Sequence, residues 1–221
     1  MLSRRRDLLL IAASLMLLSS VFLIDGAWIK AKAVVAQWLI ASSWQSETSE
    51  SRTDYRVSSL PWPWADTWPM AKLEVPHLNI TQYVMAGLDG ESLAFGPGMD
   101  PLSTEDSGLL LAGHKDTHFD YLQRLSPGDK VHVTLKNREP WEFEVTATAV
   151  VELTPQVRNI VVKENQLALV TCYPFGIEQS DPNKRYLVLA ERRQRELASS
   201  SEELLYLTQT IPWMRNLQVK M

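Results

Sequence analysis

The stretch QLALVTCYPF, residues 166–175, decides the fold, because it predicts an apolar strand that ends in a cysteine. Successive side chains of a strand point to opposite faces. One face carries Leu167, Leu169 and Thr171, and the other carries Ala168, Val170 and Cys172. Apolar residues on both faces indicate a buried strand, so the chain delivers the Cys172 thiol to a strand end, where a loop begins.

A strand with the sequence RYLVLA follows, and it opens with Arg185 after a segment of 12 residues. If the two strands pair antiparallel, Cys172 and Arg185 fall at the same end of the sheet. Most hairpin loops contain two to five residues, so this longer segment predicts a functional wall rather than a simple turn.

The segment LLLAGHKDTHF, residues 109–119, also ends an apolar strand with a polar side chain, that of His114. His114 can meet Cys172 only if these two strands run parallel, which is a prediction about topology. The other histidines are interpreted as structural or surface residues: His77, His118 and His132.

Beyond residue 70 the chain alternates short strands with turn residues, which indicates an all-β domain with short helices. Residues 131–135 and 143–151 show the clearest alternation and predict a hairpin or meander. A helical turn is expected at residues 119–125. The other predicted strands are residues 71–75, 79–84, 107–113, 166–172 and 185–190. Seven or more short strands imply a closed barrel or a sandwich.

The first 30 residues carry a membrane signature, since arginines at positions 4–6 precede an uncharged apolar run at residues 8–24. A helix of that length spans about 26 Å, close to the thickness of the hydrocarbon core. The arginines favour a cytoplasmic amino end, so residues 1–27 predict a transmembrane signal anchor that places the rest outside the cytoplasmic membrane. A signal peptide cleaved at residues 31–33 is the alternative, and both export the domain.

Residues 28–69 connect this segment to the domain. Apolar residues at helical spacing predict a juxtamembrane helix through Trp44, and the polar residues 45–59 predict a linker. Prolines in PWPWADTWP, residues 61–69, exclude a central strand, so its three tryptophans are expected to dock on the domain edge. Ligand stacking by these tryptophans is the alternative. The tail, residues 192–221, is assigned no function.

The formal net charge of -4 argues against a broadly basic surface for nucleic acid. Cys172 is the only cysteine, so the exported chain cannot form an internal disulfide. An unpaired thiol in that compartment indicates a chemical role, and an inert buried cysteine is the alternative.

A cysteine and a histidine can act together, because a thiolate attacks and an imidazolium can protonate the leaving amine. At reference pKa values of about 8.5 and 6.5, that ionised combination is only about 1 % of the singly protonated pair. The guanidinium of Arg185 favours the thiolate and can bind a developing oxyanion. Asp116 can accept from a nearby donor or cap the turn before Phe119.

These segments together resemble the motifs of the sortase family. The run ALVTCYPF with Arg185 resembles the sortase cysteine motif, usually written TLxTC with an arginine about a dozen residues later. The run AGHKDTH resembles the histidine motif, and Ala168 departs from the threonine of the pattern. The likeness covers residues 70–190. The run PWPWADTWPMAKLEVP resembles the Gram-negative, class GN or marine proteobacterial branch, which would place the domain in the periplasm.

The resemblance implies a closed eight-stranded β-barrel over residues 70–191 and a cysteine transpeptidase. Cys172 would attack a peptide bond in the C-terminal sorting signal of an exported protein, and an amine acceptor in the envelope would resolve the thioacyl-enzyme. By position, His114 is the general acid/base and Arg185 the ligand of substrate and oxyanion. Two further residues are candidates for substrate contact: Thr171 and Asp116. No cofactor or metal is expected, since no carboxylate cluster suited to calcium is evident.

Three alternatives were weighed against this function. Cysteine transpeptidases that crosslink cell-wall peptides place a histidine and a glycine shortly before the cysteine, where this chain has Val170 and Thr171, so they are disfavoured. A hydrolytic cysteine protease of the envelope would need similar side chains. A non-enzymatic, membrane-tethered binding module would hold Cys172 in its core.

Overall fold

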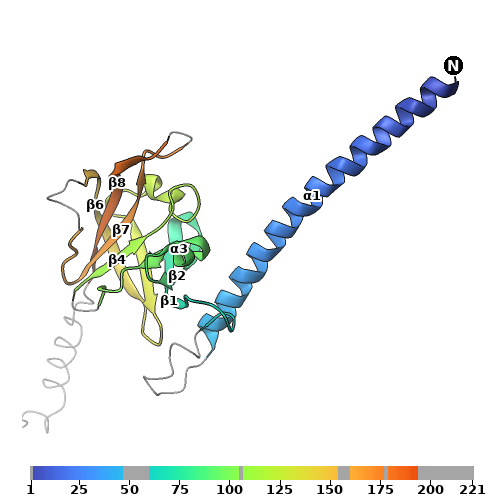
Figure 1. The fold of residues 1–221 in the computed structure, drawn as a ribbon. Coiled ribbons are helices and arrows are strands. Elements are labelled where there is room, and N and C mark those ends of the chain that lie inside the picture. Colours follow the sequence, from blue (N-terminus) through green and yellow to red (C-terminus); the bar gives the residue numbers. More distant parts are fainter. Residues whose placement is uncertain (1, 47–59, 105–106, 154–159, 177–178, 194–221) are drawn as a thin grey trace, which may run out of the picture.

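The computed structural model describes residues 2–46, 60–104, 107–153, 160–176 and 179–193. Within these residues, eight strands close into one barrel in the order β1-β2-β3-β4-β7-β8-β6-β5 (Figure 1). The strands are β1 (Pro69–Val75), β2 (Ile80–Ala86), β3 (Gly98–Met99), β4 (Leu109–Ala112), β5 (Lys130–Leu135), β6 (Trp141–Glu152), β7 (Gln166–Tyr173) and β8 (Asp181–Arg192). The helices are α1 (Leu2–Gln45), α3 (Gly90–Phe95), η1 (Pro76–Leu78) and η2 (Asp120–Arg124). The barrel confirms the all-β class and excludes the sandwich.

The pairing around β7 confirms the predicted topology. β4 runs parallel to β7, with Ala112 opposite Val170. β7 runs antiparallel to β8, with Cys172 opposite Arg185. The strands β5 and β6 form the expected hairpin. The chain therefore leaves β4 and β7, and enters β8, at one end of the barrel, which we call the site end.

β7 is buried on both faces, as its composition predicts. Leu167 and Leu169 belong to the main core inside the barrel. Ala168 and Val170 face the other way and form, with Leu187 of β8, a second apolar group that we call the outer cluster. On this outer face β7 carries Ala168 and Val170, and β8 carries Leu187. From these residues onward, polar side chains that could react are therefore found only where the two strands reach the site end.

The connection between β7 and β8 is shorter than the sequence predicts. β8 begins at Asp181, which pairs with Tyr173, so residues 174–180 separate the strands instead of 12 residues. Pro182 and Asn183 lie in the register shift between β7 and β8 and so have no partner residue in β7. On the opposite edge of β8, Leu153 N–H, directly after β6, donates to the Asn183 carbonyl at 2.6 Å. Pairing with β6 thus extends the strand through residues whose composition is typical of a turn.

Two elements at the start of the barrel were not predicted. β3 consists of two residues that bridge β2 and β4. The six-residue helix α3 begins after Asp89, whose carboxylate accepts from Ser92 N–H at 2.8 Å and so caps the helix. The tail beyond residue 193 and the linker residues 47–59 lie outside the described residues.

The amino-terminal segment forms one continuous helix, with no break between the residues expected as anchor and those expected as juxtamembrane helix. α1 has 44 residues, a length of about 66 Å at 1.5 Å per residue, and most of it extends away from the barrel in Figure 1. Its last turns pack on the domain, since Ile40 is fully buried and Gln37 Nε2 donates to the Phe95 carbonyl at 2.7 Å. In the part of the chain that the structure describes, no helix combines the length and apolar character needed to cross a membrane.

The tryptophans of residues 61–69 behave differently from one another. Trp62 packs edge-on against Phe95 with ring centroids 5.0 Å apart, and Trp68 Nε1 lies 3.1 Å from the sulfur of Met70. Trp64 is 79 % exposed, so the expectation that all three dock is wrong for this residue. The two neighbouring contacts hold the segment, and they leave Trp64 without a packing role on the barrel.

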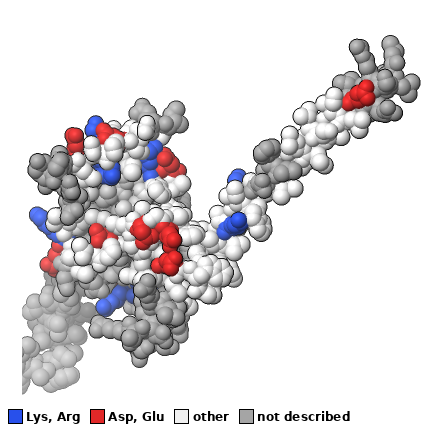
Figure 2. Space-filling view, in the orientation of Figure 1, with Lys and Arg blue, Asp and Glu red and all other residues white. Residues whose placement is uncertain are grey.

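Charges of both signs are interspersed over the described residues on the face shown in Figure 2. That face presents no broad basic surface among those residues, which agrees with the expectation drawn from the net charge. The described part of α1 is mostly uncharged in the same view.

A lysine from the barrel closes the carboxyl end of α1. Lys136, directly after β5, donates from Nζ to the carbonyls of Ser43 at 3.0 Å and Ser46 at 3.2 Å, and to that of Trp44. The same ammonium lies 5.2 Å from the centre of the Trp44 ring. The last carbonyls of a helix have no intrahelical partner, and a cation beside them also interacts favourably with the helix dipole.

We therefore expect Lys136→Met to loosen the docked end of α1 while leaving the barrel intact. The substitution keeps the length of the stem but removes the donor and the charge, at a cost of about 1 kcal/mol to the last turn. Hydrogen exchange followed by mass spectrometry should show faster exchange in residues 40–46. Lys130→Met is the matched control, because Lys130 lies in β5 and pairs with the partly exposed Glu142 carboxylate at 3.0 Å. Equal protection of residues 40–46 in both variants would contradict the role of Lys136.

Candidate active site

The β4–β7 pairing brings His114 level with Cys172. Ala112 lies opposite Val170, and the register continues past the strand because Gly113 N–H donates to the Val170 carbonyl at 3.1 Å. Two residues further along each chain come His114 and Cys172. On the other side of Cys172, Arg185 is its direct partner in β8. Three adjacent segments thus carry His114, Cys172 and Arg185 at neighbouring backbone positions at the site end.

Cys172 and Arg185 belong to the face of the outer cluster, and His114 comes two residues after Ala112, which packs on that cluster. Cys172 follows Ala168 and Val170 at intervals of two residues, and Arg185 precedes Leu187 by two. Exposure fits a reactive group, since Cys172 is a free, partly exposed thiol and His114 is exposed. An inert core cysteine would be fully buried, so the described environment favours the chemical role of Cys172.

A cavity of about 490 Å³ opens on this same outer face. Val170 and Leu110 form its floor, and Arg185 lies at its border. Its walls come from Leu88 in the turn between β2 and α3, from the connection between β3 and β4, and from the connection between β6 and β7. The residues of the two connections are Asp100, Leu102, Ser103, Ser107, Gly108, Leu153, Ile160, Val161 and Val162. The lining is mainly apolar with a few polar groups, as is typical of a site that binds an extended ligand or a small molecule.

The Arg185 side chain is held by the backbone at the start of β8. Its Nη1 donates to the carbonyls of Pro182 at 3.0 Å and Lys184 at 2.8 Å. A guanidinium has five N–H donors, so these two bonds leave capacity for a substrate carbonyl or an oxyanion. The register shift between Cys172 and Tyr173 thus provides the carbonyls that orient the arginine.

The turn after β4 positions His114 through its own backbone. The His114 carbonyl accepts from Phe119 N–H at 2.9 Å and from Thr117 N–H at 3.4 Å. The ring of Phe119 packs against Gly113, where an added Cβ would lie 2.9 Å from the Phe119 Cγ. A side chain at position 113 would therefore displace Phe119 from the core or move the histidine.

Thr171, a candidate for substrate contact, is 2 % exposed. Its hydroxyl donates to the Gly113 carbonyl at 2.6 Å and so links the residue before Cys172 to the residue before His114. This geometry gives Thr171 a positioning role and leaves almost none of its surface for a ligand.

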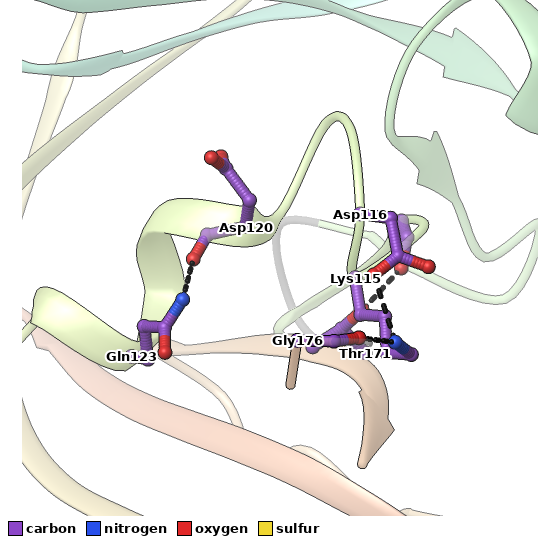
Figure 3. A network of polar contacts seen from close by, with 7 residues as sticks. Lys115, Asp116, Asp120, Gln123, Thr171 and Gly176 are labelled. Carbon is purple, nitrogen blue, oxygen red and sulfur yellow. Dashed lines mark hydrogen bonds and ion pairs between the residues drawn. The ribbon is translucent and has the colours of Figure 1, made fainter. Parts of the chain in front are cut away.

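Asp116 and a residue that sequence reasoning missed, Lys115, form the network drawn in Figure 3. Lys115 Nζ donates to Asp116 Oδ1 at 2.7 Å and to the Gly176 carbonyl at 2.8 Å. The Asp116 side chain is 64 % exposed, and of the two roles expected for it the structure shows the first, acceptance from a nearby donor. Contact between Asp116 and a substrate stays a prediction. Among the described residues, no group of three or more histidine, cysteine or acidic side chains could hold a metal ion.

His118 is a half-buried second histidine next to the site. Burial lowers the pKa of His118, a hydrogen bond with the backbone of Ala94 opposes that shift, and the charge of His114 adds to it. The backbone carbonyl of His118 accepts from Gln82 Nε2 at 2.8 Å, which ties this turn to β2. His118 thus favours the neutral form in the folded chain, as suits the structural role predicted for it.

We expect His118→Gln to make stability less sensitive to acid. Below the reference pKa of about 6.5, the unfolded chain gains a proton that the folded chain resists, so His118 destabilises the protein as pH falls through that range. Between pH 7.5 and 5.0 the Tm of the variant should therefore fall less steeply than that of the parent chain. Each kcal/mol of pH-dependent destabilisation that is removed corresponds to about 2–4 °C in Tm. His132→Gln, at a partly exposed position on β5, is the control. A slope unchanged from the parent chain would refute this contribution of His118.

The fold and the site together define a closed β-barrel with a cysteine, a histidine and an arginine aligned across three adjacent segments. Comparison with known proteins agrees, because the model of the Sortase domain matches residues 73–193, more than half of the chain. The chain therefore belongs to the sortase family.

Individual relatives support the same family. Sortase D of Bacillus subtilis (strain 168) is 30 % identical over 124 residues, which are 54 % of this chain and 62 % of that protein. The match thus spans less than two thirds of that relative. Among solved structures, a Clostridium perfringens Sortase D5 transpeptidase has a TM-score of 0.53 at 16 % identity, covering 72 % of this chain and 96 % of the other. A lid mutant of Sortase A from Corynebacterium diphtheriae has a TM-score of 0.50 at 22 % identity, covering 80 % and 99 %, and both similarities concern the fold alone.

Proposed function

We propose that this chain is a cysteine transpeptidase that cleaves the C-terminal sorting signal of an exported protein and transfers the product to an amine. The observation that carries the proposal is the alignment of His114, Cys172 and Arg185 across β4, β7 and β8, on the face that bears the cavity. A thiol, a proton carrier and a fixed cation are the groups that acyl transfer through a thioester needs.

The first half of the reaction forms the thioacyl-enzyme. The Cys172 thiolate attacks the carbonyl carbon of the scissile peptide, and a C–S bond forms as the carbonyl oxygen becomes an oxyanion. Arg185, whose Nη1 is held by the carbonyls of Pro182 and Lys184, donates to that oxyanion through its remaining N–H groups. Collapse breaks the C–N bond, and the His114 imidazolium gives its proton to the departing amine.

The second half reverses the roles of these groups. An amine acceptor attacks the thioester carbonyl and loses a proton to neutral His114, and the C–S bond breaks to restore the thiolate. The new amide joins the exported protein to the acceptor. If water takes the place of the amine, the same steps give hydrolysis, which is the second candidate function.

The cavity supports a peptide substrate that approaches along the outer face. Leu110 and Val170 form the apolar part of its lining, and Arg185 also lines it. Arg185 is in turn the strand partner of Cys172. Leu102 and Val161 are exposed apolar side chains on its two walls. We infer that apolar residues of the sorting signal occupy this cavity and position the scissile bond at the thiol.

Trapping the acyl-enzyme tests this function most directly. The full chain would be incubated with exported proteins of a bacterial host, and peptides attached to Cys172 would be read by mass spectrometry. Wild-type protein should carry a C-terminally truncated peptide, and amine acceptors should convert it to a ligated product. We expect Cys172→Ala to lower kcat by about 1,000-fold or more and Arg185→Ala to lower it by about 100-fold or more. The Tm of both variants should equal that of the parent chain.

Thr146→Val is the control for this experiment, because Thr146 is an exposed β6 residue whose hydroxyl donates to the Leu189 carbonyl at 3.2 Å, away from the site end. A product that ends in a free carboxylate, and not in an amide to the acceptor, would favour the hydrolase. Full turnover by Cys172→Ala would overturn the assignment in favour of another active site. Failure of thiol reagents to label Cys172 in the folded chain, together with absence of turnover, would overturn it in favour of a binding module.

We also propose that the amino-terminal helix attaches the enzyme to the cytoplasmic membrane with the barrel on the outer side. Support comes from the sequence, where three arginines precede the uncharged residues 8–24. The resemblance of residues 61–76 to the Gram-negative branch supports a periplasmic location for the barrel.

Fractionation of cells that express the full chain tests this attachment. We expect the protein in the alkaline-resistant membrane pellet, with a periplasmic reporter active when it is fused after residue 193. Leu15→Arg with Leu18→Arg should shift it out of the pellet, because charges at the centre of a spanning helix cost about 2.5–3.5 kcal/mol each. Ser14→Ala with Ser20→Ala is the control. Recovery of the parent chain in the soluble cytoplasmic fraction would contradict the proposal.

A further inference from the structure

Lys115 is a charged side chain that the reaction described above does not use, yet it is 7 % exposed. An ammonium is seldom buried unless hydrogen bonds or ion pairs compensate for the water it loses. Two contacts do so here, with the Gly176 carbonyl at 2.8 Å and with Asp116 Oδ1 at 2.7 Å (Figure 3).

These contacts join the two loops that carry the reacting groups. Lys115 follows His114 directly, and Gly176 comes four residues after Cys172 in the segment that leaves β7. In Figure 3 the Lys115 side chain reaches from one loop to the Gly176 carbonyl of the other.

The lysine has a counterpart on the other side of the reacting pair. There the Thr171 hydroxyl donates to the Gly113 carbonyl at 2.6 Å. One cross-link therefore joins the residues directly before His114 and Cys172, and the other joins the residue after His114 to Gly176, four residues after Cys172. The strand ladder no longer fixes the chain beyond Gly113, so the second cross-link constrains the segment that the ladder leaves free.

We propose that Lys115 is a positioning residue, which holds His114 at the correct place relative to Cys172 by tying the loop after β4 to the loop after β7. This inference rests on the proposed function of the site, and it assigns Lys115 no contact with substrate. Without the ammonium, the Gly176 carbonyl and the Asp116 carboxylate lose their shared donor, and the two loops can move apart. Misplacement of a catalytic group by about 1 Å can lower a rate by about 100-fold.

The chemistry of this arrangement predicts which kinetic constant changes. The cavity that binds substrate is lined by other residues, so loss of Lys115 should leave KM nearly constant. Proton transfer between the imidazole and the thiol requires their alignment, so kcat should fall. Alkylation of Cys172 should slow as well, because a histidine in place beside the thiol can accept its proton as the sulfur attacks.

The test compares Lys115→Met and Lys115→Arg in the full chain. We expect Lys115→Met to lower kcat by about 10–100-fold with KM changed less than about twofold. Lys115→Arg, which keeps a charged donor of different shape, should recover part of this loss and remain about 3–10-fold below the parent. Lys72→Met is the matched control, because it removes a lysine and its 3.0 Å ion pair with Glu74 from β1.

Iodoacetamide labelling of Cys172 at pH 7 separates failure of this inference from failure of the proposed function. If the parent chain turns over no peptide, slower labelling of Lys115→Met alone still supports the positioning role. Unchanged kcat and labelling in folded Lys115→Met, or a loss confined to KM, would overturn it. Should Lys115→Met not fold, Lys115→Arg decides, since a kcat equal to that of the parent would overturn the inference as well.

Discussion

The parallel pairing of β4 with β7 is the constraint on which the site depends. Hairpins join neighbouring strands at alternate ends, whereas parallel strands finish at the same end. Here that pairing carries Ala112 and Val170 in register, and the hydrogen bond from Gly113 N–H to Val170 extends it to the point where His114 and Cys172 emerge. Antiparallel β8 adds Arg185 from the opposite chain direction. Residues far apart in sequence are thus aligned by backbone pairing alone.

Burial on both faces of β7 explains why the chemistry lies at its end. Leu169 fills the barrel interior and Val170 the outer cluster, so an ionisable group at either position would lose its water without compensation. After Val170, Cys172 is the next residue of β7 on the outer face, and its side chain is partly exposed. The same apolar face provides Leu110 and Val170 to the lining of the cavity.

Much of this arrangement could be predicted from the sequence, because alternation marks β5, β6 and β7 and apolar runs ending in His114 and Cys172 mark the site. The start of β8 could not, since Asp181 and Pro182 are typical of a turn. The strand reaches them because Asp181 pairs with Tyr173 of β7 and the Asn183 carbonyl accepts from Leu153 N–H. β3 is too short for any periodicity. Lys115 has no distinguishing pattern, because its burial depends on a carbonyl 61 residues away.

The contact of Lys136 with the end of α1 has a mechanical consequence. A continuous helix of about 66 Å resists bending. At its carboxyl end, the hydrogen bonds of Lys136 and the burial of Ile40 restrain rotation of the barrel relative to the helix. The helix and the barrel therefore keep one relative orientation, which the contacts of Lys136 and Ile40 set. Any contact that fixes the amino-terminal half of α1 therefore also fixes the orientation of the barrel edge that carries Cys172.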